Sequence, residues 1–124
     1  IQLILGSILE SNADVIVNAA NSRLQHNGGV AHAISMAAGT DVQAECSSYV
    51  KQHGEVSTSD VYISGPGRLK FKAIIHAVGP IYRAQTNANT LLCNTISNIM
   101  KCCEGRKWSN VALPAISTGI FSFP

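Results

Sequence analysis

The pattern of apolar and polar residues predicts strands and helices that alternate along the chain. Short apolar runs predict strands at residues 2–5, 14–19, 60–64, 72–78 and 111–116. The run at 14–19 is typical of a strand that is buried on both faces of a parallel sheet. Gly65-Pro66-Gly67 predicts a turn between the third and fourth strands.

Three segments have the spacing of amphipathic helices. The first covers residues 30–38 and ends at Gly39, which suits a left-handed backbone. Thr40-Asp41-Val42-Gln43 then resembles a capping box and begins a second helix that ends near Gly54. The third helix covers residues 89–103, and Gly105 stops it. Apolar residues at helical spacing mark its buried side: Leu92, Ile96, Ile99, Met100 and Cys103.

This alternation predicts an α/β fold in which a largely parallel sheet is covered by helices on both faces. In such folds a ligand binds where the carboxyl ends of the strands meet. Two loops of small residues follow strands at that edge. One is His26-Asn27-Gly28-Gly29-Val30-Ala31, after Val17–Asn21, and the other is Ser117-Thr118-Gly119-Ile120, within Pro114–Phe121.

Both loops have the features of a phosphate-binding site. Backbone N–H groups that are freed at a loop and at a helix N-terminus point outward together, and the helix macrodipole adds positive potential. Gly28, Gly29 and Gly119 have no Cβ atom that would keep a ligand away from those groups. Two such loops can hold a diphosphate.

Five segments give the chain its resemblance to a known family: Gly6-Ser7-Ile8, Asp14–Asn21, the Gly-Gly-Val of residues 28–30, Ile74–Pro80 and Pro114–Phe121. In this combination the chain resembles the macro domain family, whose members bind ADP-ribose. It is most similar in style to the macro domains of vertebrate multi-domain ADP-ribosyltransferases, the PARP family, and also resembles those of coronaviruses.

The resemblance implies a three-layer α/β/α macro domain with a central, mostly parallel mixed sheet. In the family a further helix and strand follow the second loop, whereas this chain stops at Pro124. We therefore expect a single macro domain over residues 1–124 that lacks its C-terminal helix and strand.

The resemblance also implies which residues contact ADP-ribose. Ser7 and Ile8 would lie at the adenine, Asn21 and Phe121 at the distal ribose, and the two loops at the diphosphate. For Asn21 the alternative is a residue that only stabilises a loop, because Asn favours turns. The full set of expected contacts is Ser7, Ile8, Ala19, Asn21, Asn27, Gly28, Gly29, Val30, Ala31, Ala115, Ser117, Thr118, Gly119, Ile120 and Phe121.

Two positions depart from the family pattern. Asn27 replaces a glycine, although Asn tolerates a left-handed backbone. Ser7 replaces an aspartate whose carboxylate accepts a hydrogen bond from the adenine amine, and a serine hydroxyl accepts without the assistance of charge. We therefore expect weaker or less adenine-selective binding.

Of the four histidines, His26 is the candidate for chemistry, since it directly precedes the glycine loop. His76 is expected to be a core histidine, and His32 and His53 to lie on helix surfaces. The cysteines at positions 46, 93, 102 and 103 lack the spacing of a zinc site. We therefore expect no metal, no cofactor besides the ligand ADP-ribose, and reduced thiols in the cytoplasm or nucleus.

Composition limits the size of the fold and the kinds of partner. A chain of 124 residues is one domain that can bury a core. Its net charge is +2, and the nine Lys and Arg residues are spread along the chain, which gives little support to nucleic-acid binding. No apolar run reaches the length of a membrane span. The expected partners are ADP-ribose and ADP-ribosylated proteins.

Three functions remain open at this stage. The leading one is a reader of ADP-ribose, free or attached to protein. The second is a hydrolase of mono-ADP-ribosyl esters on acidic residues, with Asn21 and His26 as catalytic candidates. Members of the family that hydrolyse such esters often carry Asp directly after Gly-Gly-Val, where this chain has Ala31. The general base that this Asp would supply is therefore absent, and we expect a slow rate of hydrolysis. Coronavirus-type members that have the same Gly-Val-Ala are nevertheless hydrolases. The third is a degenerate macro domain that serves as an interaction scaffold, for which Ser7 and Asn27 are the supporting departures.

Overall fold

The computed structural model describes Leu9 and residues 12–26, 29–79 and 88–113, and this part of the chain forms four strands and three helices. In chain order they are β1 (Val15–Ala20), α1 (Gly29–Ala38), α2 (Thr40–His53), β2 (Val61–Ser64), β3 (Ala73–Val78), α3 (Ala88–Gly105) and β4 (Val111–Ala112). The predicted α/β class is confirmed.

The four strands form one sheet in the order β2-β3-β1-β4. Strand β1 runs parallel to both β3 and β4, whereas β2 is antiparallel to β3. The sheet is therefore mixed and mainly parallel, as expected. In the register between β1 and β3, Asn18 lies opposite His76, which brings two polar residues together in the middle of the sheet.

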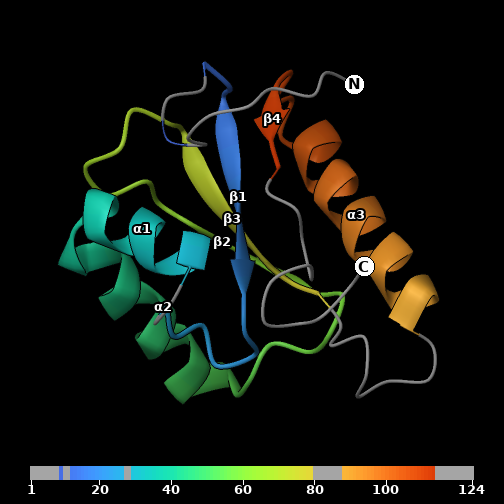
Figure 1. The fold of residues 1–124 in the computed structure, drawn as a ribbon, viewed down its shortest axis with the longest axis horizontal. Coiled ribbons are helices and arrows are strands. Elements are labelled where there is room, and N and C mark those ends of the chain that lie inside the picture. Colours follow the sequence, from blue (N-terminus) through green and yellow to red (C-terminus); the bar gives the residue numbers. More distant parts are fainter. Residues whose placement is uncertain (1–8, 10–11, 27–28, 80–87, 114–124) are drawn as a thin grey trace.

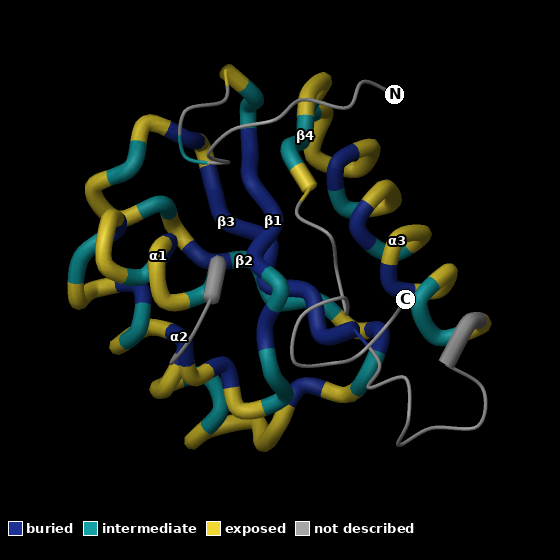
Figure 2. Tube along the Cα trace, in the orientation of Figure 1, coloured by how far each residue is buried: buried dark blue, intermediate teal, exposed yellow. Residues whose placement is uncertain are grey.

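Helices cover both faces of this sheet, with α1 and α2 on one side and α3 on the other (Figure 1). Ile16 and Ile34 belong to the core cluster under α1 and α2, whereas Val17 and Ile99 belong to the cluster under α3. Successive side chains of a strand point to opposite faces, so β1 and β3 contribute to both clusters. Figure 2 draws these two strands almost wholly as buried. The three-layer arrangement is thus confirmed.

The helices and the strands β1, β2 and β3 begin and end within two residues of their predicted boundaries. The strand predicted at residues 2–5 and the end of the strand predicted at 111–116 lie outside the described residues. The boundaries of the described elements were predictable because turn residues bound each apolar run.

The predicted capping box at Thr40–Gln43 is wrong. Gly39 precedes α2 with a φ of +93°, and no side chain of the described residues caps the helix. The positive φ agrees with the choice of glycine, but the ψ of 178° is extended and not left-handed helical. The Gln43 side chain does not fold back to the helix start because it binds the loop before α1 instead.

Asp14 forms hydrogen bonds that connect the segment before β4 to the segment before β1. Its Oδ2 accepts the backbone N–H groups of Ser109 at 2.9 Å and Asn110 at 3.4 Å. The bond from Ser109 is the main reason why the pKa of Asp14 lies below its ordinary value. These bonds hold the start of β4 beside the start of β1.

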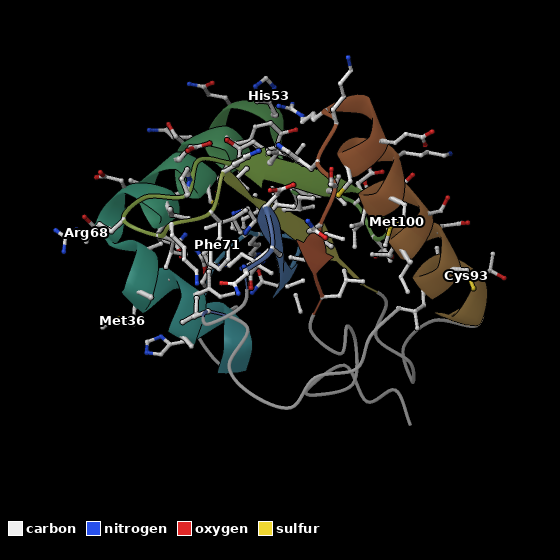
Figure 3. All side chains as sticks on the ribbon, turned by 90° about the horizontal axis from the view of Figure 1, so that it is seen from above. Met36, His53, Arg68, Phe71, Cys93 and Met100 are labelled. Atoms are coloured by element: carbon white, nitrogen blue, oxygen red, sulfur yellow. The ribbon has the colours of Figure 1, made fainter. Side chains whose placement is uncertain are left out.

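The helices expose the side chains that point away from the sheet. Figure 3 shows Met36 at the outside of α1 and Cys93 at the outside of α3, whereas Phe71 lies in the core under α1 and α2. The four cysteines are free thiols, as expected. Within the described residues, every helix is too short or too polar to span a bilayer.

Candidate functional site

Three parallel strands end at the same edge of the sheet, and the chain enters the two predicted ligand loops from two of them. The ends are Ala20 in β1, Val78 in β3 and Ala112 in β4. The first loop follows β1, and the second predicted loop, Ser117–Ile120, comes after β4 in the sequence and lies outside the described residues. Since β1 and β4 are neighbours, both loops start from adjacent strands at the edge where α/β proteins bind ligands.

The structure describes the side chains of three predicted ligand residues, Ala19, Asn21 and Ala31, and all three are partly exposed. Ala19 is the one residue of β1 that is not buried. For Gly29 and Val30 the structure describes the start of α1 and not the side chains. The other predicted contacts lie outside the described residues: Ser7, Ile8, Asn27, Gly28, Ala115, Ser117, Thr118, Gly119, Ile120 and Phe121.

Helix α1 starts at Gly29, inside the predicted phosphate loop. The first N–H groups of a helix have no partner within the helix, and they carry the positive end of its dipole. The first turn of α1 contains no acidic residue that would neutralise this end. The N-terminus of α1 is therefore suited to an anion, and it lies one loop beyond the carboxyl end of β1.

Asn21 holds the loop between β1 and α1 in shape. Its Nδ2 donates to the carbonyl oxygen of Gln25 at 2.9 Å, and its Oδ1 accepts the Gln25 N–H at 3.0 Å. The backbone N–H of Leu24, which has a φ of +52°, donates to the Asn21 carbonyl at 3.0 Å. The loop-stabilising role of Asn21 is thus present. An amide has a second N–H and a second lone pair, so Asn21 can still bind a ligand hydroxyl.

Gln43 of α2 holds the same loop from another side. Its Oε1 accepts the backbone N–H of His26 at 3.0 Å, and its Nε2 donates to the carbonyl oxygen of Leu24 at 2.9 Å. The Nε2 also donates to Ser47 Oγ at 3.1 Å. Sequence reasoning missed this role, because nothing in the local pattern around Gln43 indicates a partner 17 or 19 residues away.

Behind the loop, Asn18 joins two buried histidines. Its Nδ2 lies 3.1 Å from Nδ1 of His26 and 3.0 Å from Nδ1 of His76. The two imidazole rings are stacked, with centroids 4.9 Å apart. Burial lowers the pKa of His26. Burial, together with the neighbouring His26, lowers the pKa of His76 to about 3. Both rings are therefore neutral at pH 7.

The predictions for the other histidines are confirmed. His76 is a bonded core residue, and His32 and His53 are exposed on their helices. The role of Asn18 was missed, although the sequence contains a signal for it. Asn18 and His76 are the polar residues within two otherwise apolar strands, and buried polar groups need partners.

The Nε2 atom of His76 lies near two further side chains, Ser64 and Cys46. Because His26, Cys46 and His76 lie close together, we considered whether they could bind a metal ion. His76 Nε2 lies 2.8 Å from Ser64 Oγ and 3.6 Å from Cys46 Sγ. His26, Cys46 and His76 each place a ligand atom within 4.8 Å of the others, which is close enough for a metal site.

The ring geometry argues against a metal at this cluster. An imidazole binds an ion in its own ring plane, where the nitrogen lone pair lies, and the planes of His26 and His76 are stacked with only 17° between them. A single ion therefore cannot lie in both planes. We interpret the cluster as a hydrogen-bonded core.

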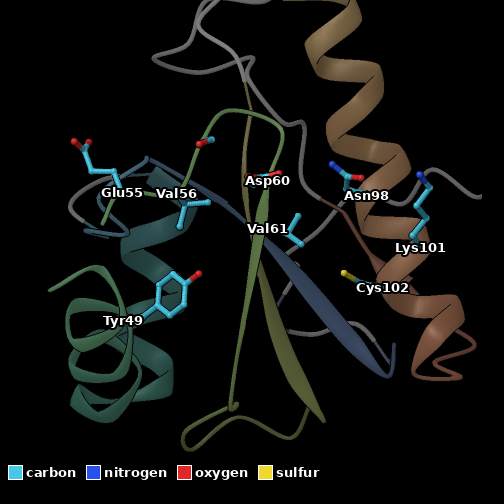
Figure 4. A pocket seen from close by; sticks show the side chains of 9 residues that line it. Tyr49, Glu55, Val56, Asp60, Val61, Asn98, Lys101 and Cys102 are labelled. Atoms are coloured by element: carbon cyan, nitrogen blue, oxygen red, sulfur yellow. The ribbon is translucent and has the colours of Figure 1, made fainter. Parts of the chain in front are cut away.

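A hollow of about 340 Å³ lies elsewhere, beside the edge strand β2 (Figure 4). Tyr49 lines one side of it, and Asn98 and Lys101 of α3 line the other. Its lining contains two carboxylates, of Glu55 and Asp60, and one ammonium group, of Lys101. This excess of negative charge disfavours the binding of a diphosphate. None of the predicted ligand residues that the structure describes lines this hollow, so it is not the candidate site.

Comparison with known proteins agrees with this geometry. The macro domain family matches residues 17–124. A protein of Sulfurisphaera tokodaii is 45% identical over 124 residues, which cover 100% of this chain and 67% of that protein. An O-acetyl-ADP-ribose deacetylase of Escherichia fergusonii is 40% identical over 125 residues, which cover 100% of this chain and 71% of the deacetylase.

The human protein mono-ADP-ribosyltransferase PARP14 is 38% identical over 121 residues, which cover 96% of this chain and 7% of that protein. The expected similarity to the PARP family is therefore confirmed.

Among solved structures, a mutant of the Oceanobacillus iheyensis macrodomain with ADPR superposes with a TM-score of 0.92 at 34% identity, covering 97% of this chain and 67% of that one. The chain thus spans about two thirds of the length of the Sulfurisphaera and Oceanobacillus proteins. Because the family model matches residues 17–124, which is most of the chain, and the Oceanobacillus macrodomain superposes over 97% of it, the chain belongs to the macro domain family.

Proposed function

We propose that this chain binds ADP-ribose, either free or as the mono-ADP-ribosyl modification of a protein. The observation that carries the proposal is the pairing of β4 with β1, through which the chain enters two glycine-bearing loops from adjacent parallel strands. A diphosphate held between these loops would meet the N–H groups at the start of α1. Support comes from the Oceanobacillus macrodomain, a mutant of which was solved with ADPR.

The ribose next to the diphosphate would bind at Asn21. Its amide is already oriented by the two bonds to Gln25 and keeps one donor and one acceptor for hydroxyl groups. A side chain that is ordered before the ligand arrives loses less conformational entropy on binding. Phe121 as a second ribose contact, and Ser7 and Ile8 as adenine contacts, remain predictions.

Titration calorimetry with ADP-ribose, ADP and AMP tests the proposal. We expect saturable one-to-one binding of ADP-ribose and weaker binding of AMP, which has neither the second phosphate nor the second ribose. Absence of saturable heat with ADP-ribose would contradict the proposal and favour the scaffold.

Gly29→Val tests the contribution of the first loop. A branched side chain at the start of α1 would cover the N–H groups, so we expect at least about a tenfold loss of ADP-ribose affinity, the size of about 1.4 kcal/mol. Gly105→Val is the matched control, because a Cβ at Gly105 has no neighbour within 4 Å. Equal affinities of the two variants would remove the first loop from the site.

A second function, ester hydrolysis, is favoured by the relatives that are named O-acetyl-ADP-ribose deacetylases, at 40% and 41% identity. The first turn of α1 carries Ala31 and no acidic residue, so no carboxylate there can activate water. Incubation with O-acetyl-ADP-ribose and with a protein mono-ADP-ribosylated on acidic residues separates the two functions. We expect slow release or none, and release at the rate of the Escherichia relative would make the chain an enzyme.

A further inference from the structure

The outer edge of β2 is open within the described part of the chain. Strand β2 pairs with β3 on one side, and no described strand pairs with its other side. The carbonyl oxygen of Asp60, just before β2, accepts the Val78 N–H at 3.2 Å and therefore points to β3. Because the backbone groups of successive strand residues point to opposite sides, Val61 and Ile63 turn their N–H and C=O groups to the open edge. Such an edge can pair with a further extended segment.

The hollow beside β2 gives that segment room on both faces of the sheet. Its volume is about 340 Å³. Tyr49 of α2 lines one side, Asn98 and Lys101 of α3 line the other, and Val61 of β2 lies between them (Figure 4). A segment that pairs with β2 would point its side chains alternately toward α2 and toward α3. The hollow therefore fits an extended occupant.

Hydrogen bonds from α3 hold the turn that leads into β2. Asn98 Nδ2 donates to the carbonyl oxygen of Ser59 at 2.8 Å, and Ser59 Oγ donates to the carbonyl oxygen of Leu91 at 2.6 Å. The Ser59 N–H also donates to the carbonyl oxygen of Val78 at 2.7 Å. The exposed side chain of Asp60 thus extends from a fixed turn. An edge that is ordered before binding loses less conformational entropy when a partner pairs with it.

The charges around the hollow favour a basic segment. Its lining has two carboxylates, of Glu55 and Asp60, and one ammonium group, of Lys101. Glu55 is already bound by Ser22 Oγ at 2.9 Å and pairs with Arg23, whereas no described residue forms an ion pair with Asp60. A Lys or Arg side chain of the segment can therefore pair with Asp60.

The hollow lies at the same edge of the sheet as the proposed ADP-ribose site. Asp60 is bonded to Val78, the last residue of β3, and Val78 lies opposite Ala20, the last residue of β1. Neighbouring strands are about 4.8 Å apart, so the end of β1 lies about 10 Å across the sheet from Asp60. An extended chain covers that distance in about three residues. Glu55 also connects the two regions, because it accepts the bond from Ser22 of the loop between β1 and α1.

We propose that the open edge of β2 and its hollow bind an extended, basic segment of the ADP-ribosylated protein, next to the modified residue. This inference rests on the proposed function, since it gives the chemistry of the protein part of the modified partner. Val61 and Ile63 form the backbone bonds to the segment, and Asp60 pairs with its Lys or Arg. ADP-ribose binding recognises the modification, and the hollow selects among modified proteins.

Two short mono-ADP-ribosylated peptides that differ only in a Lys or a Glu about three residues from the modified residue test this selection. We expect calorimetric titration to show about fivefold tighter binding of the Lys peptide, the size of an exposed ion pair. The net charge of +2 would by itself favour the Glu peptide, so a preference for Lys has to come from the hollow. Equal affinities, or tighter binding of the Glu peptide, would overturn the proposal.

Asp60→Asn locates the preference. This variant should bind the two peptides equally and keep the affinity for free ADP-ribose, because Asp60 is not among the predicted ADP-ribose contacts. Asp41→Asn is the matched control, an exposed carboxylate of α2 that does not line the hollow, and it should keep the preference for Lys. A preference that survives in Asp60→Asn would overturn the assigned ion pair.

Hydrogen exchange tests the backbone pairing. Saturation with the modified Lys peptide should slow exchange of the Val61 and Ile63 N–H groups at least about tenfold, whereas saturation with free ADP-ribose should leave both unchanged. Unchanged exchange in the peptide complex would overturn the pairing. Slow exchange of both groups without peptide would also overturn it, because the edge would then be covered by the chain itself or, where the slowing depends on protein concentration, by a second copy.

Failure of the proposed function would be distinguishable from failure of this inference. If free ADP-ribose does not bind, the unmodified Lys peptide at high concentration should still slow exchange at Val61 and Ile63, and the docking surface would stand. If free ADP-ribose binds but the modified peptides show neither the preference for Lys nor the slowed exchange, the proposed function would stand and the docking surface would be wrong.

Discussion

Gly67 illustrates how a single residue limits the packing of this fold. It has a φ of +58°, and a Cβ at this position would overlap the carbonyl oxygen of Ala38 and lie 3.0 Å from Val42. The neighbouring Arg68 N–H donates to the same Ala38 carbonyl at 2.8 Å, so the loop between β2 and β3 is held against the end of α1. Only glycine fits this approach of two backbones.

We predict that Gly67→Ala lowers the free energy of unfolding by at least about 2 kcal/mol, through overlap and an unfavourable φ. Urea unfolding followed by circular dichroism measures the change. Gly65→Ala is the matched control in the same loop, because its nearest neighbour would be the Glu45 Oε1 atom at 3.8 Å. Similar midpoints for the two variants would show that the loop moves away at little cost.

At the scale of elements, α2 contributes to the site by holding a loop that belongs to another element. The loop between β1 and α1 is bound internally by Asn21 and externally by Gln43, which takes one donor and one acceptor from it. Without Gln43, the backbone groups of Leu24 and His26 would each lose a partner, and the loop would sample more conformations before the ligand binds.

We predict that Gln43→Ala weakens ADP-ribose binding about three- to tenfold while the protein stays folded, because it removes two bonds of modest net strength. Calorimetric titration gives the affinity, and faster hydrogen exchange of the His26 N–H would localise the effect. Gln52→Ala, an exposed change on the same helix, should leave both unchanged. Normal affinity in the Gln43 variant would mean that Asn21 alone suffices to hold the loop.

For the whole molecule, the buried histidines link stability to pH. The pKa of His76 is about 3 in the folded chain and about 6.5 in an unfolded one, because burial disfavours the charged ring. Below pH 6.5 the unfolded state therefore binds a proton that the folded state does not, and stability falls as the pH drops toward 3. The pKa of His26 is lowered for the same reason and acts in the same direction.

We predict that the free energy of unfolding falls between pH 6.5 and 4.5, with a limiting slope of about 1.4 kcal/mol per pH unit for His76, to which His26 adds in the same direction. Urea unfolding at intervals over this range measures the slope, and above pH 6.5 the histidines should contribute none. His76→Phe keeps a ring in place and should reduce the slope by about one proton, whereas His53→Gln, at an exposed position, should not alter it. An unchanged slope for His76→Phe would show that His76 is accessible to protons in the folded chain.

Much of the architecture was predictable because its signals are local. The apolar runs of β1 and β3 and the helical stripe of α3 each lie within one short segment, and turn residues bound them. The capping box failed for the opposite reason: Thr40–Gln43 has the right residues, but the Gln43 side chain has a more distant set of partners. Asn21 was predicted as a ligand residue with loop stabilisation as the alternative, and its bonds to Gln25 confirm the stabilising role, whereas the ligand contact stays a prediction.

By itself, the sequence determined where the described helices and the strands β1, β2 and β3 lie, that a largely parallel sheet lies between two helical layers, and that the first glycine loop follows a strand. Backbone preferences and apolar periodicity act over a few residues, so these features can be seen in the chain. Only the tertiary structure decided that Asn18 faces His76, that Gln43 holds the loop before α1, and that β4 lies beside β1. Those pairings depend on strand register and on contacts between residues far apart in the chain, where many alternatives satisfy the same local pattern and close packing selects one.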